Sequence, residues 1–87
     1  MEYKTSDLNL AAFLKAAHNL KVVRLEPNPF TKDKAFFVFS TTDIAVIERY
    51  IASYYNEEDS CSINAFMREL NDLKSWLKDY RINREIK

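Results

Sequence analysis

In the segment KAFFVFSTTDIAVIERYIASYYN, residues 34–56, the spacing of the apolar residues changes halfway. From Ala35 to Phe39 every residue is apolar, which is typical of a buried strand. From Ile44 onward the large apolar residues recur at helical spacing. The polar residues 40–43 between the two patterns carry side-chain oxygens that can cap a helix. The segment therefore predicts a strand over residues 34–40 and a helix that ends near residue 56.

The residues before this segment predict a helix and a further strand. Ser6 and Asp7 can cap a helix that runs to about His18, and Asn19 is a plausible left-handed stop. Residues 20–26 then have the composition of a strand. The seven residues from Pro27 to Asp33, with the only two prolines of the chain, suit a loose hairpin connection.

The residues after the segment predict a last helix. Ser62 can cap it, and its apolar residues alternate spacings of three and four, as in a heptad repeat: Ile63, Phe66, Leu70, Leu73, Leu77 and Tyr80. The predicted order is thus α-β-β-α-α, a small α+β domain in which a two-stranded antiparallel ribbon packs with three helices. We expect residues 1–87 to form one domain, with residues 81–87 as a frayed tail.

Composition limits the environment and the partners of the chain. Thirteen basic residues balance thirteen acidic ones, so no net charge attracts the protein to nucleic acid or to an anionic membrane. The single cysteine, Cys61, cannot form an internal disulfide, which favours a reducing compartment. No apolar stretch approaches the ~20 residues of a membrane span. We expect a cytoplasmic protein that does not enter a membrane.

The chain shows no pattern of a catalytic, metal or cofactor site. It contains no glycine, which excludes the phosphate-binding loops and nucleophile elbows that depend on this residue. His18 is the only histidine and Cys61 the only cysteine, so we interpret both as structural. The acidic run 57–59 lacks the alternation of a calcium loop and is interpreted as a solvated turn. The sequence therefore predicts a protein that is not an enzyme and needs no cofactor.

The strand over residues 34–40 is apolar on both faces. Phe37 and Phe39 point to one side, and Phe36 and Val38 point to the other. Helices normally cover only one face of an antiparallel pair, so either the three helices wrap both faces or a second chain covers one. A two-stranded ribbon also leaves its edges open. On this ground we expect a homodimer, with a host protein as a further partner.

Two sets of residues are candidates for binding. Five aromatic residues, which either have a polar tip or lie in the apolar strand, form a candidate protein interface: Phe36, Phe37, Tyr54, Tyr55 and Trp76. Of these, Tyr55 is the residue least explained by core packing. Three basic residues share one face of the last helix and form an alternative, nucleic-acid face: Lys74, Lys78 and Arg81. Acidic residues interleave with the basic ones, which also fits an ordinary charged helix surface.

Three stretches of the chain resemble a family of short proteins of bacteria and their phages that have no assigned function. They are YKTSDLNLAAFLK at residues 3–15, FFVF at residues 36–39, and the last helix with Phe66, Leu70 and Leu73. The resemblance implies a phage or mobile-element origin and supplies no catalytic residues. We therefore expect a small protein-binding module, an accessory factor or inhibitor of a host or defence protein. The alternative is a nucleic-acid-binding regulator.

Overall fold

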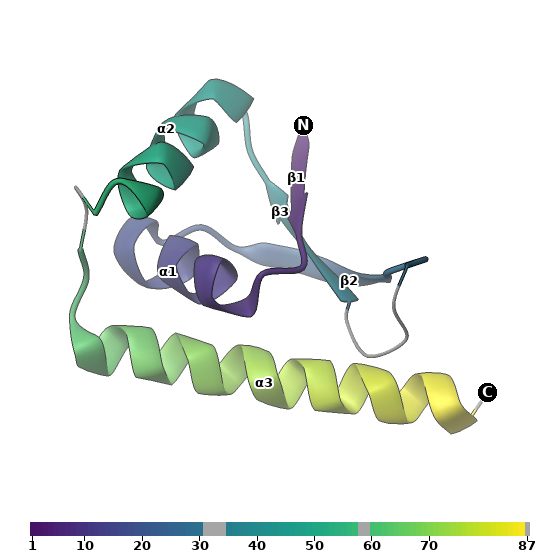
Figure 1. Cartoon of the computed structure of the whole chain (residues 1–87). Coiled ribbons are helices and arrows are strands. Elements are labelled where there is room, and N and C mark those ends of the chain that lie inside the picture. The colour runs from purple at the N-terminus through teal and green to yellow at the C-terminus, as the bar shows by residue number, and fades with distance from the viewer. Residues whose placement is uncertain (31–34, 58–59, 87) are drawn as a thin grey trace.

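The computed structural model describes residues 1–30, 35–57 and 60–86, and the side chains as far as residue 82. Three helices and a three-stranded antiparallel sheet make a small α+β domain (Figure 1). The strands lie in the order β1-β3-β2. The elements follow along the chain as β1 (Glu2–Thr5), α1 (Leu8–His18), β2 (Val22–Pro27), β3 (Ala35–Ser40), α2 (Ile44–Tyr55) and α3 (Ile63–Ile86).

The prediction of a two-stranded ribbon was wrong, because the first residues of the chain form a third strand. β1 pairs with β3, with Glu2 opposite Ser40 and Thr5 opposite Phe37. The order is therefore β-α-β-β-α-α rather than α-β-β-α-α. β1 is four residues long and has one large apolar residue, Tyr3, so its alternation of polar and apolar residues is too short to identify a strand. It becomes a strand because β3, which is far away in the sequence, offers its hydrogen-bonding edge.

The helix starts that the sequence predicted are confirmed. The Leu10 amide donates to Asp7 Oδ1 at 3.1 Å, and Asn19 ends α1 in the left-handed conformation, with φ of 54°. Asp43 caps α2 by accepting from the amide of Ala45 at 2.9 Å. These motifs are local, since each cap bonds a backbone group within three residues, and this is why they can be identified in the sequence.

α3 is longer than its apolar stripe. It continues to Ile86, beyond Tyr80, where the stripe ends. Leu70 and Leu73 are buried, as the heptad pattern predicted, whereas Ile63 in the first turn is 78% exposed. That residues 81–87 fray stays a prediction.

The core lies around α1, which has the sheet on one side and α2 and α3 on others (Figure 1). Five consecutive residues of α1, from Leu10 to Leu14, are buried. Five residues cover more than one helical turn, so neighbours must surround this helix on almost all sides. Ala11 and Ala12 have no long side chain and let those neighbours approach. The sheet contributes Phe37 and Phe39 to the same core.

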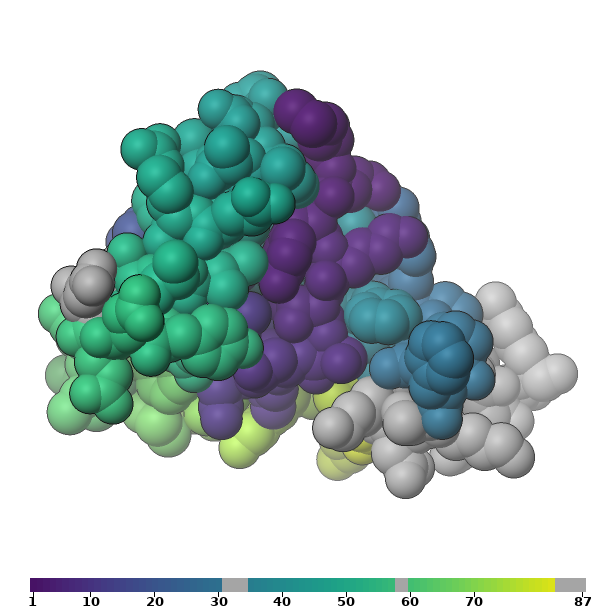
Figure 2. All heavy atoms as spheres, turned by 45° about the horizontal axis from the view of Figure 1, so that its top comes forward, coloured from purple at the N-terminus to yellow at the C-terminus, as the bar shows by residue number. Residues whose placement is uncertain are grey.

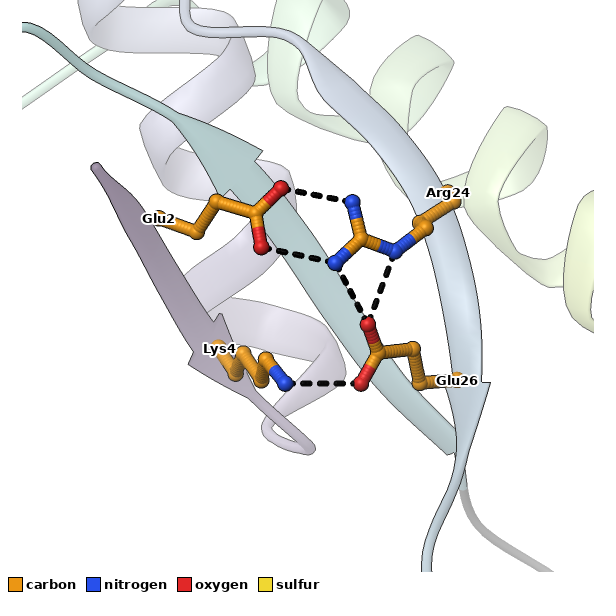
Figure 3. Close-up of polar contacts among 4 residues, drawn as sticks. All are labelled: Glu2, Lys4, Arg24 and Glu26. Carbon is orange, nitrogen blue, oxygen red and sulfur yellow. Dashed lines mark hydrogen bonds and ion pairs between the residues drawn. The ribbon is translucent and has the colours of Figure 1, made fainter.

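The second face of β3 is covered by ion pairs within the same chain (Figure 3). Arg24 of β2 reaches both carboxylate oxygens of Glu2 in β1, at 2.6 and 2.7 Å, and also Glu26, at 2.6 and 2.7 Å. Lys4 of β1 completes the network with a 2.8 Å bond to Glu26. In the register of the sheet Lys4 and Arg24 flank Val38 on its two sides, and Val38 is fully buried. The aliphatic stems of these long side chains shield it from water.

Both faces of the apolar strand β3 are thus covered by other parts of the same chain. β3 is the central strand, so both of its edges are paired, and no second chain is needed to bury Val38. The apolar faces of β3 therefore give no reason to expect a dimer. A dimer, if one forms, must use another surface.

A β-bulge in β2 positions Arg24 for this network. Val22 lies opposite Phe39, but Arg24 lies opposite the next residue, Val38, so Val23 is the extra residue. Because side chains alternate between the two faces of a strand, a regular register would direct Arg24 toward the core. The bulge instead places it on the outer face and returns Leu25 to the inner one.

We expect the network to make the stability of the fold depend on pH in the acidic range. Hydrogen bonds from Arg24 and Lys4 lower the pKa values of Glu2 and Glu26 below the ordinary value of 4.5. A lowered pKa gives stability that is present above pH 4.5 and is lost as the pH falls through the folded-state values. In Arg24→Met the urea midpoint should therefore change less between pH 5 and pH 3 than in the wild type.

The matched control for this experiment is Arg68→Met, because Arg68 is exposed and its only described ion pair is a 3.9 Å contact with Glu69. It should keep the acid dependence of the wild type. The network is exposed to solvent, so salt should weaken the effect. Equal acid profiles for the wild type and Arg24→Met would show that the network does not stabilise the fold.

Candidate functional site

The five candidate interface residues do not form one surface. Phe37 is 1% exposed and belongs to the core, so it is not available to a partner. Phe36 is half-buried on the outer face of the sheet, beside Glu26 in the register. Trp76 lies on α3 and is 37% exposed. Only Tyr54 and Tyr55, at the end of α2, remain neighbours on one surface.

Tyr54 and Tyr55 lie in a group that also includes Tyr3 and Asp7, which we call the tyrosine cluster. Consecutive helical residues point about 100° apart, so Tyr54 packs on Phe13 of α1, with ring centroids 4.8 Å apart, while Tyr55 points outward. The two tyrosine rings meet edge to face, with centroids 5.2 Å apart and planes at 72°. Tyr55 is 63% exposed. The cluster thus presents one exposed ring, Tyr55, that is supported by a half-buried one, Tyr54.

The hydroxyls of Tyr3 and Tyr54 are held in their neutral form, because the pKa values of both groups are raised. Burial raises the pKa of Tyr3, a hydrogen bond with Thr5 opposes this, and Tyr55 and Asp7 raise it further. Burial also raises the pKa of Tyr54, with Asp7 and Tyr55 adding to the effect. The Asp7 carboxylate therefore acts on two of the three rings. Near neutral pH these hydroxyls can both donate and accept hydrogen bonds.

Sequence reasoning missed Tyr3, because it did not place the first residues in a strand. The alternation Glu2-Tyr3-Lys4, polar-apolar-polar, was the available signal, but three residues are too few to distinguish a strand from a loop. The tertiary structure then brings this residue near the end of α2, where β1 and α2 are neighbours (Figure 2).

His18 connects the cluster to the end of α1. Its ring stacks on Tyr50, with centroids 3.6 Å apart and planes at 7°, and meets Phe13 edge to face at 5.7 Å. This packing between α1 and α2 gives the only histidine of the chain a structural role. Cys61 is half-buried against the core. Neither residue belongs to a set of three or more potential metal ligands among the described residues.

Asp7 also borders an open hollow of about 420 Å³. Leu8, Ala35, Phe37 and Leu77 form its apolar lining, and Ser6, Asp7 and Arg81 add polar groups. α3 contributes to it through Leu77 and Arg81, past the part of this helix that packs on α1. The hollow is large enough for one apolar side chain of a partner, and it has charges of both signs nearby.

The three residues of the candidate nucleic-acid face lie on α3, but they do not all have the same surroundings. Lys74 and Lys78 are exposed, and neither has an ion pair with another described residue. Arg81 is exposed too, yet it also borders the hollow. The ion pair that joins α3 to α1, between Lys15 and Glu69 at 3.1 Å, lies elsewhere on the helix. Two lysines and one arginine make a small patch compared with the 6–10 phosphate contacts typical of DNA-binding proteins.

Comparison with models of protein families identifies the family of the chain. Residues 1–80 match the model of a protein family described as a domain of unknown function, DUF5659. No curated protein and no solved structure matches the chain. Among the described residues, no helix combines the length and the hydrophobicity that a membrane span requires.

Proposed function

We propose that this chain, which belongs to the DUF5659 family of domains of unknown function, is a non-enzymatic protein-binding module whose contact surface is the tyrosine cluster. The observation that supports this best is the exposure of Tyr55, 63%, beside two half-buried tyrosines, Tyr3 and Tyr54. Family membership assigns no activity, so the proposal depends on the surfaces of the molecule.

A supported aromatic ring is a favourable anchor for a partner. Tyrosine offers a large apolar area at a low cost in side-chain entropy, and its hydroxyl can bond at the rim of an interface. Tyr54 packs against Phe13 from behind and meets the edge of Tyr55, which restricts the motion of the exposed ring. The neighbouring hollow could accept an apolar side chain of the same partner.

The partner that we propose is a host or defence protein in the host cytoplasm, with the chain acting as a phage or mobile-element accessory factor or inhibitor. This rests on the resemblance to short proteins of bacteria and phages, on the reducing environment that a lone Cys61 favours, and on the balanced charge of the chain. A homodimer of the chain is part of the proposal.

The proposal predicts that Tyr55→Ala weakens capture of the partner from a host lysate by at least about tenfold, because aromatic anchors commonly contribute more than 1–2 kcal/mol to binding. Capture should survive nuclease treatment of the lysate. The matched control is Trp76→Ala, since Trp76 is an exposed aromatic residue on a different element. If both variants capture the partner as well as the wild type, the tyrosine cluster is not the contact surface.

The alternative function is a nucleic-acid-binding regulator, for which substitution of the basic residues of α3, rather than of Tyr55, should abolish binding. Its basis is the exposed pair Lys74 and Lys78, with Arg81 one turn further on. We expect duplex DNA or RNA to bind no more tightly than the ~1–100 μM nonspecific range at physiological salt. Sub-micromolar binding that Lys74→Glu, Lys78→Glu and Arg81→Glu together abolish, and that Tyr55→Ala spares, would replace the protein-binding proposal with this one.

A further inference from the structure

The outer edge of β1 is a row of backbone groups without a partner in the sheet. The Thr41 amide donates to the Met1 carbonyl at 2.9 Å, so Met1 and Thr41 form a hydrogen-bonded pair between β1 and β3. Hydrogen-bonded and non-hydrogen-bonded pairs alternate along two antiparallel strands. Met1, Tyr3 and Thr5 therefore direct their backbone groups toward β3, while Glu2 and Lys4 direct theirs away from it. Within the described part of the chain no backbone hydrogen bond uses these outward groups of Glu2 and Lys4.

The two edges of the sheet differ in their protection: β1 is only short and charged, whereas β2 also has backbone features that block pairing. β2 carries a bulge at Val23 and ends at Pro27, two features that discourage pairing with another strand. β1 has neither. Figures 1 and 2 show β1 at the surface beside α2, and among the elements that the structure describes none is drawn over its outer edge.

The β1 edge is complementary to itself. In an antiparallel pair of two copies related by a two-fold axis at Tyr3, Glu2 of each copy lies opposite Lys4 of the other. This register pairs the outward backbone groups, with two hydrogen bonds at each of the two Glu2–Lys4 positions. It also places opposite charges across from each other on the outer face. A register shifted by one residue would align inward and outward backbone groups and lose these bonds.

The side chains support the same register. Tyr3 would face Tyr3 of the second copy at the non-hydrogen-bonded position on the axis, where side chains come closest and aromatic pairs are favourable. On the outer face, Glu2 and Lys4 already belong to the ion network with Arg24 and Glu26. Pairing would join the networks of the two copies into one, with the signs of the charges alternating across the new interface.

We propose that the chain forms a two-fold dimer through the β1 edge, with Glu2 opposite Lys4 and Tyr3 on the axis, giving a continuous six-stranded sheet. The inference extends the protein-binding function proposed above, because the dimer brings two tyrosine clusters to the same side of the sheet for a two-fold partner. A standard interface buries about 800 Å² per copy. A four-residue edge contributes only part of this, so the dimer should form in the micromolar range.

Sedimentation or light scattering of an N-terminally untagged chain at about 10–100 μM tests the proposal. The wild type should be a dimer, and Lys4→Pro should be a monomer. The matched control is Lys4→Gln, because both variants lose the amine that pairs with Glu26, but only proline removes the outward amide. Lys4→Gln should therefore still dimerise. A monomeric wild type at 100 μM, or a Lys4→Pro dimer of undiminished affinity, overturns the proposal.

A cross-link tests the register and does not depend on the folding of the proline variant. At the axis the two Tyr3 Cα atoms would be about 4.5 Å apart, within the range that a disulfide spans. In a Cys61→Ser background, Tyr3→Cys should form a disulfide dimer on mild oxidation. Val23→Cys, at an exposed position of the other edge strand, should not. Equal cross-linking of the two variants would exclude this register.

The two proposals can fail separately. A monomer that still captures a partner through Tyr55 contradicts edge pairing and leaves the protein-binding function in place. If the wild type is a dimer and captures no partner, only the function is contradicted.

Discussion

Phe39→Ala is expected to lower the free energy of unfolding by about 3–5 kcal/mol, the usual effect of deleting a buried phenylalanine. Phe39 is fully buried at the centre of the sheet, opposite Tyr3 of β1 and Val22 of β2, and its ring contributes to the core around α1. A domain of this length has a total stability of roughly 4–13 kcal/mol. Urea unfolding at low temperature should therefore show a strongly lowered midpoint, or no folded baseline.

Phe36→Ala is the matched control for this experiment, because it removes the same ring from the opposite face of the same strand. Phe36 is only half-buried, and it lies outside the core cluster. Its replacement should cost clearly less than that of Phe39. If the two substitutions cost the same, the outer face contributes to the stability as much as the inner one, and our assignment of the core face is wrong.

Leu73→Ala is expected to lower the free energy of unfolding by about 2–5 kcal/mol, and Leu70→Ala should act in the same direction. Leu73 is 0% exposed and Leu70 nearly so, and both hold α3 against α1. Truncation would leave a cavity that two rigid helices cannot close. Chemical denaturation followed by circular dichroism measures the effect.

The control for the helix is Ile63→Ala, since Ile63 continues the same apolar pattern but is exposed. A surface substitution of this kind should change the stability by less than about 0.5 kcal/mol. Unchanged midpoints for both Leu70→Ala and Leu73→Ala would mean that another face of α3 packs on the core.

The candidate site could be predicted only in part. Tyr55 was identified in the sequence as the aromatic residue least explained by the core, and it is exposed. Phe37 was a candidate as well, but the structure buries it, because an apolar strand residue has the same sequence signal on either face. Tyr3 and Asp7 joined the cluster only when β1, α1 and α2 came together.

The sequence by itself determined the features that depend on near neighbours. The caps at Asp7 and Asp43 and the left-handed stop at Asn19 follow from side chains within a few residues of the backbone groups that they affect. These interactions form in any conformation that brings the local segment into a helix.

Only the tertiary structure decided how the two faces and edges of β3 are covered. β1 is a strand because it pairs with β3, more than thirty residues later in the chain, and Val38 is buried because residues from β1 and β2 form ion pairs across it. No local pattern encodes such contacts, since they become favourable only after the chain has closed the loops between the strands. For the same reason, the self-complementary edge of β1 is recognised only once the register of the sheet is known.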